Sequence, residues 1–268
     1  MFNTIGFIGT GTMGSAVARA VVKGAPGASI LLSNRTPAKA EALAKGLGVQ
    51  ASDNETVART CSLIFLGVKP QMMGNVLESL APILAARSDR FVLASMAAGL
   101  DAGKIQEMAG GEYPVICLMP NTPVAVGAGV VEYYGLGATE AELDAFQALL
   151  SPAGLVDRIE PGQLNAASAV SGCGPAFCAL FIEALADGAV ACGLPRAKAL
   201  AYAAQMVEGT ARLMRETDSH PGVLKDGVCS PGGTTIQGVR TLEERGFRSA
   251  AMEAVIAAYD KTLEMGKK

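Results

Sequence analysis

The chain has 268 residues, of which 50% are hydrophobic and 18% are charged, and its formal net charge is −3. This composition excludes a disordered chain, and the slight negative charge argues against a nucleic-acid partner. The apolar content is high for the length, yet we find no run that approaches the roughly 18 charge-free apolar residues of a membrane span. We therefore expect no membrane partner, and expect apolar surface to be buried against a second copy of the chain.

The reactive side chains also limit the chemistry. None of the six cysteines forms a C-x-x-C pair, and most lie in apolar runs, which is typical of reduced thiols rather than disulfides or metal ligands. His220 is the only histidine, so a His-based triad is excluded and a His-rich metal site is disfavoured. The N-terminus lacks the basic region of a signal peptide. These features predict a cytoplasmic protein without a metal.

The first 160 residues alternate short apolar runs with helical patterns. Several runs, such as residues 63–66, are apolar at every position, as strands covered on both faces are. The alternation predicts an α/β fold with a largely parallel sheet, that is, an N-terminal Rossmann-like dinucleotide-binding domain over residues 1–160. The expected strands are 4–8, 29–33, 62–67, 91–94, 115–119, 129–133 and 155–159, and the expected helices are 15–23, 37–47, 72–84 and 140–150.

The pattern changes after Glu160-Pro161-Gly162. From residue 162 to residue 194 the charged residues are Glu183 and Asp187 alone, and no strand pattern follows. A helix that is apolar nearly all round must be buried. The sequence therefore predicts an all-α C-terminal dimerisation domain over residues 161–268.

A G-x-G-x-x-G motif follows the first expected strand and opens the first expected helix, which is the context that a dinucleotide-binding loop requires. Gly9 allows a tight turn, Gly11 lets the backbone approach a pyrophosphate, and Gly14 permits close packing of helix and strand. The free N–H groups of the helix start would face the phosphates. The alternative is an ordinary Gly-rich turn. The motif reads Gly9-Thr10-Gly11-Thr12-Met13-Gly14.

The end of the second expected strand selects the cofactor. An NAD site places Asp or Glu there to hold the ribose 2′-hydroxyl, whereas this chain has Ser33-Asn34-Arg35. With no carboxylate to repel a 2′-phosphate, and with Arg35 able to pair with one, the sequence predicts NADPH, with weaker use of NADH. The alternative is that Arg35 merely lies at a helix start.

A second candidate anion site is Ser230-Pro231-Gly232-Gly233-Thr234-Thr235, which precedes a helical run at 236–245. Ser is a good N-cap and Pro suits a first helical position, while bare glycine N–H groups suit a small carboxylate. Thr234 and Thr235 add hydroxyls. A plain capped turn is an equally good interpretation of these residues. Two such helix starts without a strong general base would fit hydride transfer to an electrophilic C=N bond.

Six segments between Ile5 and about Arg248 carry distinctive motifs. The most specific is Leu224-Lys225-Asp226-Gly227-Val228-Cys229-Ser230-Pro231-Gly232-Gly233-Thr234-Thr235. The others are residues 6–13, Val68-Lys69-Pro70, Ala97-Ala98-Gly99, Met119-Pro120-Asn121-Thr122-Pro123 and Ser171-Gly172-Cys173-Gly174-Pro175-Ala176. With these segments the chain resembles the pyrroline-5-carboxylate reductase family over nearly its whole length. The resemblance implies NADPH-dependent reduction of 1-pyrroline-5-carboxylate to proline by a homodimer, and some relatives form rings of dimers.

The resemblance also implies roles for residues. The loop from Ser230 to Thr235 would hold the substrate carboxylate, with the Thr235 hydroxyl near the imine nitrogen as the catalytic group. The positions Asn34, Val68, Lys69 and Ala97 would lie along the cofactor. Their location agrees with the rule that ligands bind at the carboxyl ends of parallel strands, which also points to Pro70 and Asn121. Two departures are Cys173, where many members have Ser, and the loose match of residues 50–54 to a segment that touches the adenosine.

Two other functions are weighed against this one. A β-hydroxyacid dehydrogenase shares the opening glycine pattern but needs a catalytic Lys early in the helical domain, where residues 162–167 offer none and the nearest is Lys198. A non-catalytic NADPH-binding regulator would be favoured by a degraded substrate loop, whereas residues 230–235 are intact.

Overall fold

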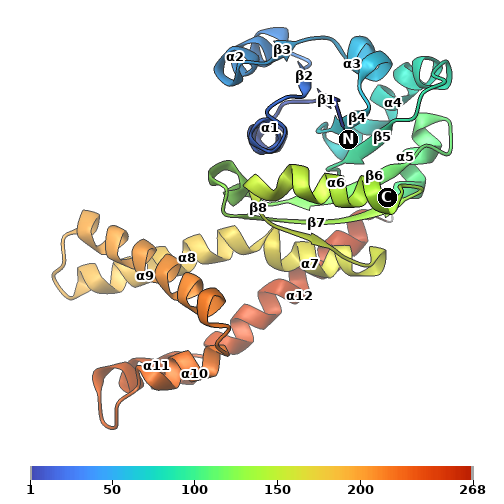
Figure 1. Cartoon of the computed structure of the whole chain (residues 1–268). Helices are drawn as coiled ribbons and strands as arrows, with labels where there is room; N and C mark the ends of the chain where they lie inside the picture. Colours follow the sequence, from blue (N-terminus) through green and yellow to red (C-terminus); the bar gives the residue numbers. More distant parts are fainter. Residues whose placement is uncertain (1, 267–268) are drawn as a thin grey trace. The chain divides into compact units, whose positions relative to one another are not determined.

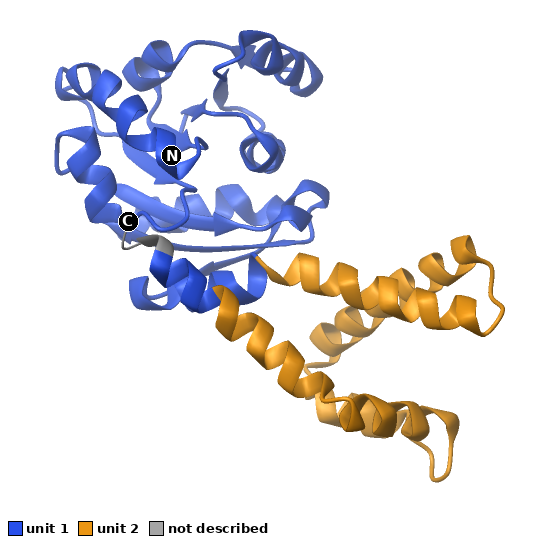
Figure 2. Cartoon of the chain, turned by 180° about the vertical axis from the view of Figure 1, so that it is seen from behind, with its two compact units in different colours: residues 1–172, 259–268 blue, residues 173–258 orange. Residues whose placement is uncertain are grey.

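The computed structural model describes residues 2–266, and the chain forms two compact units (Figure 1, Figure 2). One unit comprises residues 1–172 and 259–268 and contains the sheet; the other comprises residues 173–258 and is helical. The functional boundary expected between residues 160 and 161 stays a prediction. The α/β class with a helical C-terminal part is confirmed.

The sheet has eight strands in the order β3-β2-β1-β4-β5-β6-β7-β8. Neighbouring strands are parallel except for β6 and β7, which pair antiparallel. The chain moves from β1 to β2 on one side and returns to β4 on the other, so the carboxyl ends of β1 and β4 flank the crevice where such sheets bind ligands. The strands are β1 (Thr4–Ile8), β2 (Ser29–Ser33), β3 (Gln50–Ala51), β4 (Leu63–Leu66), β5 (Val92–Ser95), β6 (Val115–Pro120), β7 (Gly129–Leu136) and β8 (Gly154–Arg158).

Alternate residues of the buried strands face opposite cores. Phe7 stacks on Phe65 with ring centroids 4.5 Å apart, and both face the core covered by α1 (Thr12–Gly24), α2 (Pro37–Leu47) and α6 (Glu140–Leu150). Ile8 and Ile64 face the core covered by α3 (Asn54–Thr60), α4 (Pro70–Ala85) and α5 (Ala102–Ala109). Burial on both faces explains why these strands are apolar throughout.

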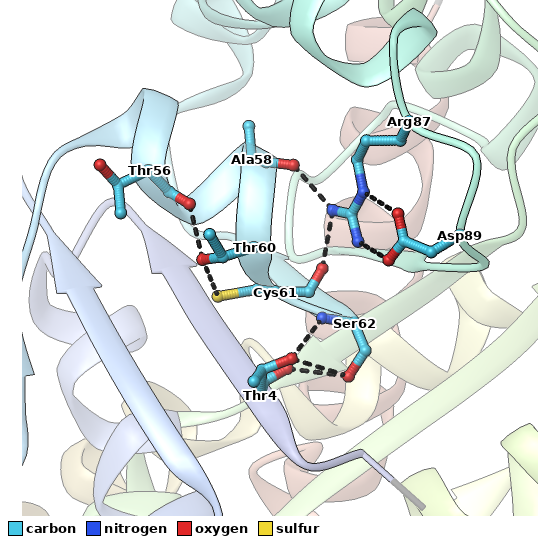
Figure 3. Close-up of polar contacts among 8 residues, drawn as sticks. All are labelled: Thr4, Thr56, Ala58, Thr60, Cys61, Ser62, Arg87 and Asp89. Atoms are coloured by element: carbon cyan, nitrogen blue, oxygen red, sulfur yellow. Dashed lines mark hydrogen bonds and ion pairs between the residues drawn. The ribbon is translucent and has the colours of Figure 1, made fainter.

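One buried arginine fastens the end of α3 to the loop after α4 (Figure 3). The Arg87 Nη1 donates to the carbonyl oxygens of Ala58 and Cys61 at 2.7 and 2.8 Å, which α3 leaves without helical partners. Its guanidinium also pairs with Asp89 at 2.6 Å and lies over the Phe91 ring. The Arg87 side chain therefore substitutes for a local helix cap.

The helical unit has little core of its own. Its buried residues are Ala186, Ala199 and Ala203, where α8 packs on α9, whereas Leu180 and Tyr202 are 68% and 62% exposed. The unit contains α8 (Gly174–Ala191), α9 (Arg196–Thr217), α10 (Pro221–Gly227), α11 (Thr234–Glu244) and most of α12 (Phe247–Gly266), while α7 (Leu164–Ser171) belongs to the first unit. Short 3-10 helices span Thr122–Val126, Ser151–Ala153 and Pro161–Gln163.

The expectation that no segment approaches a membrane span is wrong. The stretch Pro161–Ala191 is long and apolar enough to cross a membrane by length and composition alone. Its most apolar 18-residue window has a mean hydropathy of 1.6, and only 11% of that window is buried within the chain. Residues 161–182 carry no charge, but interspersed Gly, Ser and Asn conceal the run from a search for unbroken apolar residues. Such exposed apolar surface needs a cover.

Candidate active site

The predicted cofactor residues gather at one edge of the sheet. Because β1, β2, β4, β5 and β6 are parallel, the loops that follow them share the carboxyl edge. These loops and the helix starts after them carry Gly9, Gly11, Thr12, Met13, Gly14, Ser33, Asn34, Arg35, Val68, Lys69, Pro70, Ala97 and Asn121. Their roles in binding stay predictions.

The three motif glycines have different surroundings. Gly9 has a φ of +98°, and a Cβ there would lie 2.7 Å from the carbonyl carbon of Gly67. A Cβ on Gly14 would lie 2.3 Å from the Gly9 carbonyl oxygen. Around Gly11, in contrast, no described atom comes within 4 Å of a Cβ. The fold therefore requires glycine at positions 9 and 14, whereas Gly11 borders open space.

That open space lies at the start of α1. Gly11 is the N-cap residue, and no side chain caps the helix. The N–H groups of its first turn therefore have no side-chain acceptor, which is the arrangement that binds a phosphate anion. The residues present fit the pyrophosphate of a dinucleotide.

The loop after β2 borders a pocket of about 540 Å³. The Ser33 Oγ donates to Asn54 Oδ1 at 2.5 Å, and the Asn34 Nδ2 donates to Thr10 Oγ1 at 3.1 Å, so both predicted residues are fixed by side-chain bonds. Arg35 is exposed and is not part of the pocket wall. The lining residues are Ser33, Asn34, Pro37, Ser52, Asp53, Asn54, Glu55, Ser79 and Leu80.

Asp53 and Asn54 occupy this pocket although their segment only loosely matches the family. Asp53 accepts the Thr56 N–H at 2.7 Å as the N-cap of α3, and this bond holds the pKa of its carboxyl below the usual value. The Asp53 carboxylate is therefore already hydrogen-bonded to the first turn of α3. Asn54 joins Ser33 across 21 residues of sequence, a pairing that no local pattern could indicate.

The loops after β4 and β5 adjoin the glycine loop. Val68 Cγ1 would lie 2.9 Å from a Cβ on Gly9, and Met96 Cε would lie 3.0 Å from a Cβ on Gly67. Lys69 is the exposed N-cap residue of α4, and Pro70 begins that helix. Ala97 is 5% exposed and donates its N–H to Ser95 Oγ at 3.3 Å.

A second pocket of about 350 Å³ lies on the α5 side of this edge. Its wall includes Ser95 and Ala97 from the end of β5, together with Cys117 and Tyr134. Burial raises the pKa of the Cys117 thiol to about 11 and also raises the pKa of Tyr134. Both groups therefore stay neutral near pH 7. Tyr134 was not predictable from local sequence, because its neighbours come from distant segments.

Asn121 joins three segments through its side chain. Its Oδ1 accepts the Val130 N–H at 2.9 Å, and its Nδ2 donates to the Ser171 carbonyl at 3.0 Å. The side chain is thus occupied, which leaves the backbone for the predicted contact with the cofactor. Among the residues that the structure describes, Glu132 Oε2 and Ser171 Oγ are the buried side-chain oxygens without a hydrogen-bond partner.

The predicted substrate loop lies in the helical unit, between α10 and α11. The expectation that Ser230 caps the next helix is wrong, because Gly233 is the N-cap and the helix begins at Thr234. The Gly233 N–H instead closes a turn onto the Ser230 carbonyl at 3.0 Å, and Gly232 has a φ of +69°. Both Thr234 and Thr235 are exposed.

Two features lie outside these loops. His220 accepts the Gly222 N–H at 3.1 Å on Nδ1 and so caps the start of α10. The six cysteines are free; Cys61 and Cys117 are buried, whereas Cys178 and Cys192, which lie in apolar runs, are exposed on the single chain.

The doubly wound sheet, with glycines packed at the switch point and an uncapped helix start, defines a Rossmann-type dinucleotide-binding protein. Residues 4–99 match the family described as NADP oxidoreductase coenzyme F420-dependent. Residues 161–265 match the family described as pyrroline-5-carboxylate reductase dimerisation.

Full-length relatives are more specific. The chain is 41% identical to pyrroline-5-carboxylate reductase of Synechocystis sp., covering 98% of each chain, and 38% identical to that of Escherichia coli, covering both completely. The chain belongs to the pyrroline-5-carboxylate reductase family. A solved reductase from Coxiella burnetii superposes with a TM-score of 0.88 at 31% identity, and that from Plasmodium falciparum, with NADP bound, has 0.85 at 32%, each covering 98% of both chains.

A more distant solved structure bears on one alternative. The 3-hydroxyisobutyrate dehydrogenase of Mycobacterium tuberculosis is 18% identical, with a TM-score of 0.51 over 88% of this chain and 72% of that one. This likeness extends to the fold alone and gives no support to a β-hydroxyacid dehydrogenase activity.

Proposed function

We propose that this protein is an NADPH-dependent reductase of the C=N bond of 1-pyrroline-5-carboxylate, with L-proline as the product. The observation that carries the proposal is the open, uncapped helix start at Gly11 in a chain that aligns end to end with reductases of that name. When bound, NADPH would supply the hydride that adds to the imine carbon, and the proton on the nitrogen would come from solvent or from an already protonated imine. The chain's own residues must then hold the cofactor and orient the cyclic imine, so that the substrate does not bind in unproductive orientations.

In this proposal the carboxyl edge of the sheet binds the cofactor. The Gly9–Gly14 loop holds the pyrophosphate on the N–H groups of α1, and Ser33, Asn34 and Arg35 face the adenosine end. Val68, Lys69, Pro70, Ala97 and Asn121 follow the cofactor toward its nicotinamide. The fixed bonds of Ser33, Asn34 and Asn121 support these roles, because a preorganised site loses little entropy on binding.

The substrate carboxylate binds at the start of α11. Ser230, Gly232, Thr234 and Thr235 supply hydroxyl and N–H donors at a helix N-terminus that no side chain caps. Gly233, whose N–H closes the turn onto Ser230, has no side chain to obstruct the ligand. The catalytic group is the Thr235 hydroxyl, which lies near the imine nitrogen and stabilises that nitrogen by hydrogen bonding as the charge on the nitrogen changes. Orientation and charge placement account for most of the rate in this mechanism.

The protein works as a homodimer in which the helical units meet. Support comes from the match of residues 161–265 to a dimerisation family and from the exposed Leu180 and Tyr202. This explanation of the apolar stretch Pro161–Ala191 needs no membrane. We further propose that the enzyme is cytoplasmic, acts on a small-molecule substrate and has no nucleic-acid partner. We also propose that its dimers assemble into a ring.

A spectrophotometric assay tests the activity. Loss of NADPH absorbance on addition of pyrroline-5-carboxylate, with proline formed in equal amount, is the expected result. Oxidation of a 3-hydroxy acid with NADP in place of this reaction would instead identify a dehydrogenase. NADPH binding without turnover of either substrate would identify a regulator.

Cofactor preference depends on Arg35. Replacing Arg35 with Ala removes the charge that pairs with the 2′-phosphate, so we expect the KM for NADPH to rise on the order of tenfold, the worth of about 1.4 kcal/mol. The KM for NADH, which lacks this phosphate, should stay unchanged in the same assay. Arg59, an exposed arginine in the last turn of α3, provides the control variant Arg59→Ala. An unchanged preference for NADPH in Arg35→Ala would contradict the assignment.

A further inference from the structure

A tyrosine and a cysteine hold the turn between β5 and α5 from the adjacent strands. Tyr134 and Cys117 are directly opposite each other in the antiparallel pair β6–β7, and both face the α5 side of the sheet. The Tyr134 Oη accepts the Ala102 N–H at 3.2 Å, and the Cys117 thiol donates to the Leu100 carbonyl at 3.9 Å.

The other end of the same turn lies against the glycine loop. The Met96 N–H donates to the Leu66 carbonyl at 3.2 Å, and Met96 Cε packs beside Gly67, whose missing Cβ would meet the Gly9 carbonyl at 2.3 Å. Residues 96–101 therefore connect the dinucleotide loop to the Tyr134 hydroxyl. Within this turn, the Leu100 N–H bonds to the Ala97 carbonyl.

Helix α5 does not depend on Tyr134 for its start. Asp101 is the N-cap residue, and its Oδ1 accepts the Lys104 N–H at 2.8 Å. The Tyr134 bond goes to a different donor, the Ala102 N–H, in the first helical residue. Removing the hydroxyl thus leaves the capped helix in place and releases the turn before it.

We propose that Tyr134 is a positioning residue whose hydroxyl, together with the Cys117 thiol, fixes the Ala97–Leu100 turn for the nicotinamide half of the cofactor. The proposal rests on the proposed function, which puts Ala97 at the nicotinamide end. In this role Tyr134 acts through the backbone of residues 100–102, and the adenosine half, at the Ser33–Asn54 pocket, is independent of it.

The variant Tyr134→Phe keeps the ring and removes the hydroxyl. Calorimetric titration should show the Kd for NADPH raised about 3- to 10-fold, the effect of one buried hydrogen bond. The Kd for adenosine 2′-phosphate 5′-diphosphate, which lacks the nicotinamide and its ribose, should stay the same. Cys117→Ala should weaken NADPH binding in the same selective way. A general loss of structure would weaken both ligands alike.

Tyr133→Phe is the matched control. Its hydroxyl, on the adjacent residue of β7, donates to the Leu143 carbonyl at 3.2 Å on the opposite, α6 side of the sheet. Neither Kd should change in this variant. Equal weakening of both ligands in Tyr134→Phe, or no change in either, would overturn the positioning role, as would a wild-type protein that does not bind NADPH. Binding is measured without turnover, so a wild type that binds NADPH but fails to reduce the imine would refute the activity alone.

Discussion

At the scale of single residues, glycine is needed at position 11 for cofactor binding and at position 14 for packing of the fold. Gly11 has ordinary extended backbone with a φ of −71°, and a Cβ there meets no described atom within 4 Å. A Cβ on Gly14 would lie 2.3 Å from the carbonyl oxygen of Gly9. Because that oxygen belongs to the backbone, it cannot move aside as the end of a flexible side chain could. The two positions should therefore respond differently to the same methyl group.

We predict that Gly11→Ala folds normally and binds NADPH on the order of tenfold more weakly, because the methyl group enters the space for the pyrophosphate. Its melting temperature should stay close to that of the wild type, since the restriction of the unfolded chain by Ala opposes the loss of a better N-cap residue. Gly14→Ala should lose about 1–3 kcal/mol of unfolding free energy to overpacking. The measurements are thermal denaturation and calorimetric NADPH binding. Equal destabilisation by both variants would refute this division.

Local patterns could predict one part of the site and not the other. The glycine loop was predictable because its spacing, the preceding strand and the following helix all lie within about 20 residues. Asn54 and Tyr134 were not, because they reach Ser33 and Ala102 across 21 and 32 positions. The Ser230 cap was predicted wrongly, because two glycines allow a turn that moves the helix start to Thr234.

At the scale of elements, the long periodic segments were predictable and the short ones were not. Helix α2 has the predicted bounds, and α1 and α4 differ by up to three residues at their starts, whereas β3, α3 and α5 were missed. Strand β3 has two residues and α3 has seven, too few for a periodicity to appear. Helix α3 is stabilised instead by Asp53 at its start and by the distant Arg87 at its end.

We predict that Arg87→Met lowers the free energy of unfolding by about 2–4 kcal/mol, because the carbonyls of Ala58 and Cys61 lose their charged donor. Arg87→Lys should recover little of the loss, since an ammonium lacks the planar fork that reaches the two carbonyls and Asp89 together. Urea denaturation measures both. The control Asp89→Asn should be milder, because the Asp89 side chain is 62% exposed. A near-neutral Arg87→Met would show that α3 needs no such cap.

At the scale of the whole molecule, most of the exposed large apolar side chains lie in the helical unit. The sequence predicted a surface to be covered, and the structure leaves Leu180, Tyr202 and Val228 more than 60% exposed on one chain. The core of the helical unit is too small to bury these side chains within one chain. Because residues 161–265 match a dimerisation family, a second copy of the chain is the natural cover. Composition could predict that the surface is covered, but not which side chains face the partner, because that depends on packing between chains.

If the substrate loop of one chain completes the cofactor site of its partner, impaired chains should complement each other in assays with NADPH well below the wild-type Kd. At such a concentration the roughly tenfold weaker binding by Gly11→Ala removes most turnover, and Thr235→Ala should lose most turnover while its NADPH binding stays near normal. A mixed dimer of these two variants, isolated with two affinity tags, would contain one intact site of two and show about half the wild-type activity. A mixed dimer of wild type with the double variant Gly11→Ala/Thr235→Ala would have one mutation in each site and stay nearly inactive. A site built within one chain predicts the reverse, an inactive first dimer and a half-active second, so the pair of assays decides between the two arrangements.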